Sequence, residues 1–290
     1  MQGLQVRKVL ITGANGQLGH ELVRATIAAG HEVIVTSHET LDITDKTAVE
    51  AVITETRPDV VIHAAAWTAV DACESDPEKA LLVNGTATKF IADAAHAVGA
   101  HVVYISTDYV FDGSKTSAYD EGDATNPQSV YGSSKLAGER ALGATDAIVR
   151  ISWVCGFYGA NMVKTILRLA EQPQLKFVDD QIGNPTFADD AAAMIVRLAI
   201  EKRPGTWHVT NQGEVSWYQF AREVLIAGGF DADKVVPIKT HELQPPRPAT
   251  RPFNSVLNNA SLKNAGIALL PDFREPLARL VSQIQRNERG

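Results

Sequence analysis

Regular alternation of two patterns constrains the fold of this chain more than any other sequence feature. Continuous apolar runs, which suit strands buried on both faces, occupy residues 8–12, 32–36, 59–66, 101–107 and 146–152. Segments with helical spacing of apolar residues lie between them, at 16–30, 46–57, 77–99 and 129–143. This alternation predicts a parallel sheet with helices on both faces, in which ligands bind beyond the carboxyl ends of the strands.

The pattern loosens after residue 153. Helices are expected at 161–171, 189–202, 216–228 and 275–287, with short strands at 175–178 and 206–210. Segment 243–255 holds four prolines and two arginines and predicts a fixed loop. The fold class expected is therefore α/β: a doubly wound parallel-sheet Rossmann domain with a smaller α/β substrate-binding region. We assign residues 1–152 and 186–213 to the first, and 153–185 and 214–290 to the second.

Composition excludes several classes of function. A formal net charge of −7 argues against a protein that binds nucleic acid or anionic membranes through a basic face. With only two cysteines, Cys73 and Cys155, a disulfide scaffold is not expected and a reducing compartment is favoured. The chain also lacks any run of 18 apolar residues, so we expect a cytoplasmic protein.

A glycine-rich turn, "TGANGQLG", follows the first predicted strand and opens the first predicted helix. It places Gly13, Gly16 and Gly19 three residues apart. Glycine suits a tight turn in which a diphosphate lies against bare backbone at a helix N-terminus. The alternative is a plain strand-to-helix turn, but the context favours nucleotide binding.

The choice of nucleotide depends on the end of the second strand. Enzymes specific for NAD carry an acid there, whereas this chain has Ser37 and His38. No acid repels a 2′-phosphate and no arginine attracts one, so NADPH is favoured with NADH accepted. Asp42 and Ile43 are expected to flank the adenine, and a solvated loop is the alternative for Ser37 and His38.

Tyr131 and Lys135, four residues apart in "YGSSK", share one helix face. A free phenol has a pKa of about 10, and a nearby ammonium is expected to lower it. Such a pair suits proton donation to a carbonyl oxygen. A half-buried tyrosine beside a lysine of no catalytic role is the alternative.

The stretch "STDYVFDG" (106–113) ends the fourth predicted strand, at the edge where a nicotinamide would lie. Ser106 and Thr107 point to opposite faces of a strand, so one of the two hydroxyls is expected to contact a substrate carbonyl. Asp108 and Asp112 are expected to hold the loop through bonds to backbone.

These features together resemble an extended short-chain dehydrogenase/reductase, and more narrowly the dTDP-4-dehydrorhamnose reductase family. The matching stretches span nearly the whole chain: "ITGANGQLG", "RPDVVIHAAAWTAVDACE", "VYISTDYVFDG", "VYGSSKLAGE", "IVRISWV", "DDQIGNPTF" and "RPFNS".

The resemblance implies roles by position. It makes Thr107 the catalytic hydroxyl, Tyr131 the proton donor, and Lys135 the partner of Tyr131 that also bonds the nicotinamide ribose. The implied diphosphate site comprises Gly13, Asn15, Gly16, Gln17 and Leu18. The third strand would lie close to the cofactor through Ala64, Ala65 and Ala66, although small residues there also suit helix–sheet packing. The implied sugar pocket comprises Thr68, Val70, Tyr109 and Trp153, together with Thr107 and Tyr131.

Three further residues or pairs keep two interpretations each. Trp153 suits either sugar stacking or the core. Arg251 could bind the diphosphate of the substrate with its guanidinium fork or form a salt bridge. The adjacent Asp189 and Asp190 suit a helix start better than a metal, and no catalytic metal is expected.

The type of reaction is predicted from the absence of a glutamate after the fourth predicted strand. Related sugar-nucleotide dehydratases carry the sequence Thr-Asp-Glu after the fourth strand, whereas this chain has Tyr109 where the glutamate base would stand. The resemblance therefore implies reduction of the C4 keto group of a dTDP-sugar, dTDP-4-dehydrorhamnose, to dTDP-rhamnose. The alternatives are a non-catalytic NADP-binding regulatory subunit and a reductase or epimerase of another nucleotide sugar. A homodimer is left open.

Overall fold

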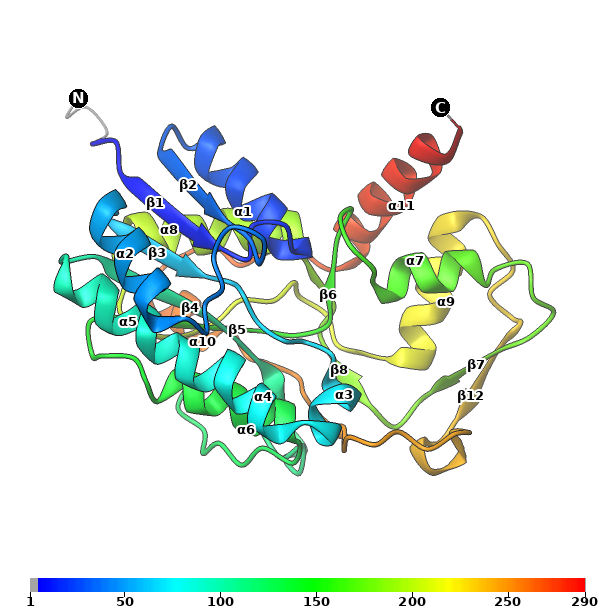
Figure 1. Ribbon diagram of the computed structural model, residues 1–290. Helices are drawn as coiled ribbons and strands as arrows, with labels where there is room; N and C mark the ends of the chain where they lie inside the picture. Colours follow the sequence, from blue (N-terminus) through cyan, green and yellow to red (C-terminus); the bar gives the residue numbers. More distant parts are fainter. Residues whose placement is uncertain (1–4, 290) are drawn as a thin grey trace.

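Six parallel strands form the central sheet of the computed structural model, which describes residues 5–289 (Figure 1). They are β1 (Lys8–Thr12), β2 (Glu32–Thr36), β3 (Val60–His63), β4 (His101–Thr107), β5 (Ala147–Ile151) and β10 (Gly205–His208). Their order is β10-β5-β4-β3-β1-β2, so β1 pairs with β2 on one side and with β3 on the other. The chain reverses its direction of winding there, and this opens a crevice at the carboxyl ends of β1 and β3.

The apolar runs become strands because the sheet is covered on both faces. All seven residues of β4 are buried, as expected of a central parallel strand without polar alternation. The predicted strand 59–66 ends three residues early, at His63, because residues 64–66 leave the sheet and line a cavity.

Helices cover both faces of the sheet (Figure 1). Those of the sheet region are α1 (Gln17–Ala28), α2 (Lys46–Thr56), α4 (Pro77–Leu81), α5 (Ala87–Ala97), α6 (Val130–Glu139), α8 (Ala188–Ile200) and α10 (Ala260–Asn264). Helix α1 packs on α8, and α2 packs on α5. The predicted doubly wound α/β fold is therefore confirmed.

The long helix predicted at 77–99 is interrupted by a π-helical turn, η1 (Leu82–Thr86). The turn directs the buried Asn84 side chain to Trp67, whose amide donates to Asn84 Oδ1 at 2.8 Å. A single widened turn of this kind often marks a functional site.

The second region lies to one side of the sheet and its helices (Figure 1). Its longer elements are α7 (Met162–Arg168), β7 (Leu175–Val178), α9 (Trp217–Gly228), β12 (Val235–Ile238) and α11 (Arg274–Arg289). Its short elements, with those of the connecting loops, are α3 (Val70–Ser75), η2 (Asp108–Val110), β6 (Val154–Cys155), β8 (Ile182–Gly183), β9 (Thr186–Phe187), β11 (Val215–Ser216) and η3 (Thr240–Glu242). The sequence patterns missed β12, α3 and α10, which are all short, and the two-residue strands β6, β8, β9 and β11.

Separate apolar clusters lie under the sheet and within the second region. Leu262, Ile267 and Leu270 come from the range assigned to the substrate-binding region, yet they pack in the cluster of the sheet. The assignment of residues to the two domains stays a prediction. Between residues 5 and 289, no helix is both long and apolar enough to cross a membrane.

Close packing at Gly138 generates a test of the fold. A Cβ at this position of α6 would lie 2.3 Å from the Tyr104 hydroxyl and 2.5 Å from the Asn84 carbonyl oxygen. We expect Gly138→Ala to lower the free energy of unfolding by about 1–3 kcal/mol, as overpacking does. Gly122→Ala, at a site with open space, is the control. Equal urea midpoints for the two variants would contradict this packing.

Candidate active site

Two adjoining cavities lie along the carboxyl ends of the strands. The first, of about 580 Å³, lies at the end of β2, and the second, of about 540 Å³, lies at the ends of β4 and β5. We call them the adenosine-side cavity and the catalytic cavity. Both are lined by Gly13, Gly16, Ala64 and Ala66, so they meet at the glycine turn. An elongated ligand could therefore extend from one into the other.

The glycine turn presents an uncapped helix N-terminus. Gly16 is the N-cap of α1 and offers no side chain, and the first turn has no acid. The first amides of a helix have no partner within it, so they and the helix dipole suit a diphosphate. Gly13 has a φ of +69°, and a Cβ there would lie 2.7 Å from the Ala65 amide nitrogen. The absence of a side chain at Gly13 therefore lets the turn contact the residues that follow β3.

Gln17 was predicted to line the diphosphate site, but its side chain is hydrogen-bonded to other protein groups. Its side-chain amide donates to the Val154 carbonyl at 2.9 Å, and its carbonyl accepts from Asn161 Nδ2 at 2.7 Å. Both side-chain groups thus join α1 to the second region, and its backbone amide is the group left for a phosphate. Leu18 lines the catalytic cavity.

The adenosine-side cavity includes the other residues predicted for the cofactor. It is lined by Asn15, Ser37, Asp42, Ile43 and Ala65. The Asp42 carboxylate accepts from the Thr44 amide and hydroxyl, and these bonds lower the pKa of Asp42. Lys79 also lines the cavity, with Nζ 4.6 Å from the centroid of the Trp67 ring. The sequence analysis missed Lys79 because it lies in α4, which follows β3, whereas the residues expected to bind the adenosine follow β2.

Tyr131 and Lys135 lie together on α6, as their spacing predicts, and both line the catalytic cavity. Lys135 Nζ donates to the Ile105 carbonyl at 2.6 Å and lies 4.0 Å from the centroid of the Tyr104 ring. Burial lowers the pKa of Lys135 to about 7.

The prediction that Lys135 lowers the pKa of the Tyr131 phenol is wrong for this structure. Burial, and next the charge of Asp108, raise the pKa of Tyr131 above its usual value. The ammonium is directed to a backbone carbonyl and does not offset the burial. As a consequence, Tyr131 keeps its proton at neutral pH, which is the form that a proton donor needs.

The two hydroxyls at the end of β4 take different partners. Ser106 donates to Glu139 at 2.5 Å, and Glu139 is paired with the buried Arg150 at 2.7 Å. Thr107 and Tyr131 line the same cavity, and Thr107 lowers the pKa of the Tyr131 phenol. Thr107 also donates to Asp108 Oδ1 at 2.8 Å. Thr107 is thus the hydroxyl close to the phenol.

An aromatic pair forms the far wall of the catalytic cavity. Trp153 and Trp217 stack with ring centroids 3.6 Å apart and planes 6° from parallel, and both line the cavity. Trp153 has a φ of +46°, which is unusual for a residue other than glycine. The sequence analysis missed Trp217, which begins α9 more than 60 residues later. The other expected sugar-pocket residues, Thr68, Val70 and Tyr109, line the same cavity.

Arg251 forms the salt bridge that was its alternative role. Both of its terminal nitrogens contact the Asp71 carboxylate, at 2.6 and 2.7 Å, and this lowers the pKa of Asp71 to about 2. Arg251 lines neither cavity. Its contact with a substrate diphosphate stays a prediction.

Other acids have structural partners. Asp112 accepts from the amide and hydroxyl of Ser114, as expected for a loop residue. Asp189 and Asp190 contact Arg279 at 2.9 and 2.6 Å. Within residues 5–289, no three or more His, Cys, Asp or Glu side chains gather as they would around a metal ion.

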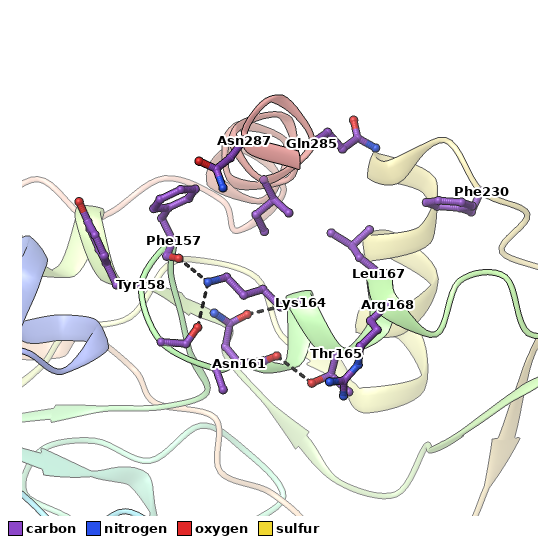
Figure 2. Close-up of a pocket in the computed structure, with 13 residues that line it drawn as sticks. Phe157, Tyr158, Asn161, Lys164, Thr165, Leu167, Arg168, Phe230, Gln285 and Asn287 are labelled. Atoms are coloured by element: carbon purple, nitrogen blue, oxygen red, sulfur yellow. Dashed lines mark hydrogen bonds between the residues drawn. The ribbon is translucent and has the colours of Figure 1, made fainter. Parts of the chain in front are cut away.

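A larger cavity of about 940 Å³ lies between α7 and α11 (Figure 2). Its polar groups bond to one another: Lys164 Nζ donates to the carbonyls of Phe157 and Gly159, and Asn161 Oδ1 accepts from the Lys164 amide. Asn161 is therefore the N-cap of α7. None of the predicted site residues lines this cavity, so its size does not make it the active site.

The comparisons with known proteins agree with the geometry. The model of the RmlD substrate binding domain family matches residues 7–286. A dTDP-4-dehydrorhamnose reductase of Burkholderia thailandensis is 42% identical, over 92% of this chain and 95% of its own. The chain belongs to the dTDP-4-dehydrorhamnose reductase family. The predicted resemblance and the predicted oxidoreductase class are thereby confirmed.

Two solved structures support this assignment. A reductase of the same name from Clostridium acetobutylicum has a TM-score of 0.92 and 43% identity, and the match covers 96% of this chain and 99% of that one. The structure from Bacillus anthracis, solved in complex with NADP, has a TM-score of 0.92 and 38% identity. That match covers 96% of this chain and all of the other.

The stacked indoles generate a prediction about the cavity wall. Removing one ring in Trp217→Ala leaves Trp153 without its partner, a contact of about 0.5–1.5 kcal/mol. We expect loss of the circular-dichroism couplet of the stacked indoles and easier acrylamide quenching of Trp153. Trp217→Phe, which keeps an aromatic face, should protect Trp153 from quenching. An unchanged couplet in Trp217→Ala would refute the stacked arrangement.

Proposed function

We propose that the protein reduces the C4 keto group of dTDP-4-dehydrorhamnose to give dTDP-rhamnose, with NADPH as the preferred cofactor and NADH accepted. The observation that carries the proposal is the meeting of Thr107, Tyr131 and Lys135 in one cavity that adjoins a second cavity at the glycine turn. The family, named for this reaction, supports the same substrate.

The cofactor fits the residues present. An uncapped helix N-terminus suits its diphosphate, and the small Ala64 and Ala66 leave room for it beside β3. Ser37, Asp42 and Ile43 would hold the adenosine half, with Lys79 as a nearby cation. When bound, the reduced nicotinamide supplies a hydride to the keto carbon.

The chain's own residues supply the proton and the orientation. Tyr131 is protonated at neutral pH and would donate to the keto oxygen as negative charge develops there. Thr107 would hold the phenol and the ketone in register. Lys135, fixed on the Ile105 carbonyl, would reach the nicotinamide ribose.

The cavity supports reduction over elimination of water. Its acidic lining residue within the described chain is Asp108, and Tyr109 follows it where a second carboxylate would be needed. Trp153, Thr68 and Val70 would contact the sugar. Free, buried Cys73 and Cys155 support a cytoplasmic location. A homodimer stays a prediction.

Tyr131→Phe tests the proposed proton donor. The variant keeps the ring in place but has no proton to give, so we expect kcat to fall about 100-fold or more while the Kd for NADPH stays within a factor of about three. The measurements are NADPH oxidation with the keto sugar and fluorescence titration of NADPH. Near-normal turnover would refute the role of Tyr131. A wild-type protein that binds NADPH but reduces nothing would favour a regulatory subunit.

Ser37→Asp tests the cofactor preference. A carboxylate at the end of β2 would repel a 2′-phosphate and could bond a 2′-hydroxyl. We expect kcat/KM to fall at least tenfold for NADPH, a change of about 1.4 kcal/mol, and to be retained for NADH. Ser37→Asn, of similar size and without charge, is the control. If both variants lose NADPH activity equally, charge at this position does not set the preference.

A further inference from the structure

Asp108 is a buried carboxyl that the proposed reaction leaves without a task. It is 2% exposed and lines the catalytic cavity. Its Oδ1 accepts the Thr107 hydroxyl proton, but its Oδ2 has no hydrogen-bond partner. The nearby Ser255 hydroxyl lowers the pKa of Asp108, although its bond is a long one of 3.4 Å to the Ile182 carbonyl. A buried carboxylate oxygen without a partner is costly, so its retention beside a reactive phenol points to a role.

Thr107 joins this carboxyl to Tyr131. A hydroxyl has one proton and two lone pairs. The Thr107 proton goes to Asp108, and one lone pair accepts the Tyr109 amide at 3.3 Å. The second lone pair is left for the phenol of Tyr131, which lines the same cavity and whose pKa is lowered by Thr107. The phenol and the carboxyl are thus the two ends of a chain with a single hydroxyl between them.

The direction of this chain depends on the proton of Asp108. With a carboxylate, the Thr107 proton is held by Asp108, and Thr107 can only accept from the phenol. With a carboxylic acid, Asp108 donates to Thr107 and Thr107 donates to Tyr131. The phenol proton is then free to face the ketone, and the phenol oxygen has a donor ready for its developing charge.

We propose that Asp108 in its acid form recharges Tyr131 through Thr107 during the reduction. Tyr131 gives its proton to the keto oxygen, Thr107 gives its proton to the phenolate, and Asp108 gives its proton to Thr107. Asp108 is left as a carboxylate and takes a proton from water before the next turnover. The hydride that reduces the carbon comes from the reduced cofactor, which is oxidised, so only protons move through this chain. The proposal rests on the proposed reductase function, and Asp108 acts through Thr107 without touching the substrate.

The electrostatics agree with this direction of transfer. Burial raises the pKa of Asp108 to about 6, against the lowering effect of the Ser255 and Thr107 hydroxyls. Burial raises the pKa of Tyr131 above that of a free phenol. A proton therefore moves from Asp108 to a Tyr131 phenolate downhill.

The charge of Asp108 is stabilised by hydrogen bonds and not mainly by a neighbouring cation. The phenols of Tyr109 and Tyr131 face it, and charging Asp108 raises the pKa of each. In the same cavity, Lys135 is bonded to the Ile105 carbonyl, and beyond Tyr109 the Arg251 guanidinium is paired with Asp71. Neither cation is among the main causes of the pKa shift of Asp108.

The test is the pH dependence of single-turnover NADPH oxidation with the keto sugar. The acid form of Asp108 is the active one, so the wild-type rate should fall as pH rises through about 6. Asp108→Asn has similar shape but no proton to release. We expect it to lose this limb and to be about 10–100-fold slower at pH 5.5, while the limb near 7 from Lys135 remains.

Two variants of Thr107 separate relay from structure. Thr107→Ser keeps the hydroxyl and should keep the limb near 6, whereas Thr107→Val should lose it. The Kd for NADPH should stay within a factor of about three in all variants. A wild-type profile in Asp108→Asn, or a retained limb in Thr107→Val, would overturn the relay.

A second measurement does not depend on turnover. Infrared difference spectra of the NADPH complex between pH 5 and 8 should show the C=O stretch of a buried carboxylic acid that titrates near 6 and is lost in Asp108→Asn. Its absence would overturn the relay even in an active enzyme. Its presence in a protein that does not reduce the keto sugar would refute the proposed function while leaving the buried acid of Asp108 in place.

Discussion

The catalytic cavity depends on one buried amide, Asn84, in the π-helical turn η1. Its side chain accepts from the Trp67 amide at 2.8 Å and donates to the Trp67 carbonyl at 3.1 Å and the Ser134 hydroxyl at 3.0 Å. Its backbone carbonyl accepts from the Tyr104 hydroxyl at 3.0 Å. The loop after β3, helix α6 and strand β4 are therefore joined at one point. A fully satisfied buried network of this kind specifies a single arrangement, because each displaced group would lose its partner.

A second buried interaction fixes the depth of α6. Glu139 lies four residues after Lys135 and binds both Ser106 and Arg150. Removing one member of such a pair leaves an uncompensated buried charge, which is strongly destabilising. The same carboxylate also raises the pKa of Lys135 against the lowering effect of burial. The position of α6 and the charge of Lys135 thus both depend on the Glu139 carboxylate.

The fold was predictable where local pattern and tertiary burial agree. Strands 8–12, 32–36 and 101–107 were predicted with their observed ends, because a covered parallel sheet selects continuous apolar runs. The interruption of helix 77–99 was not predictable, because it arises from the bond between Asn84 and Trp67, 17 residues apart. Trp217 and Lys79 were missed for the same reason, since only the folded chain brings them to the cavities. The pairing of Arg251 with Asp71 spans 180 residues and likewise has no local signal.

The electrostatics of the cavity are typical of a site that holds and exchanges protons near neutral pH. Tyr131 is held neutral, Lys135 is close to losing its charge, and Asp108 is close to gaining a proton at the same neutral pH. Burial is the first cause in all three cases, and it shifts each group towards its uncharged form. A reduction needs a neutral donor and a way to restore it, and the proposed chain of Tyr131, Thr107 and Asp108 would supply both.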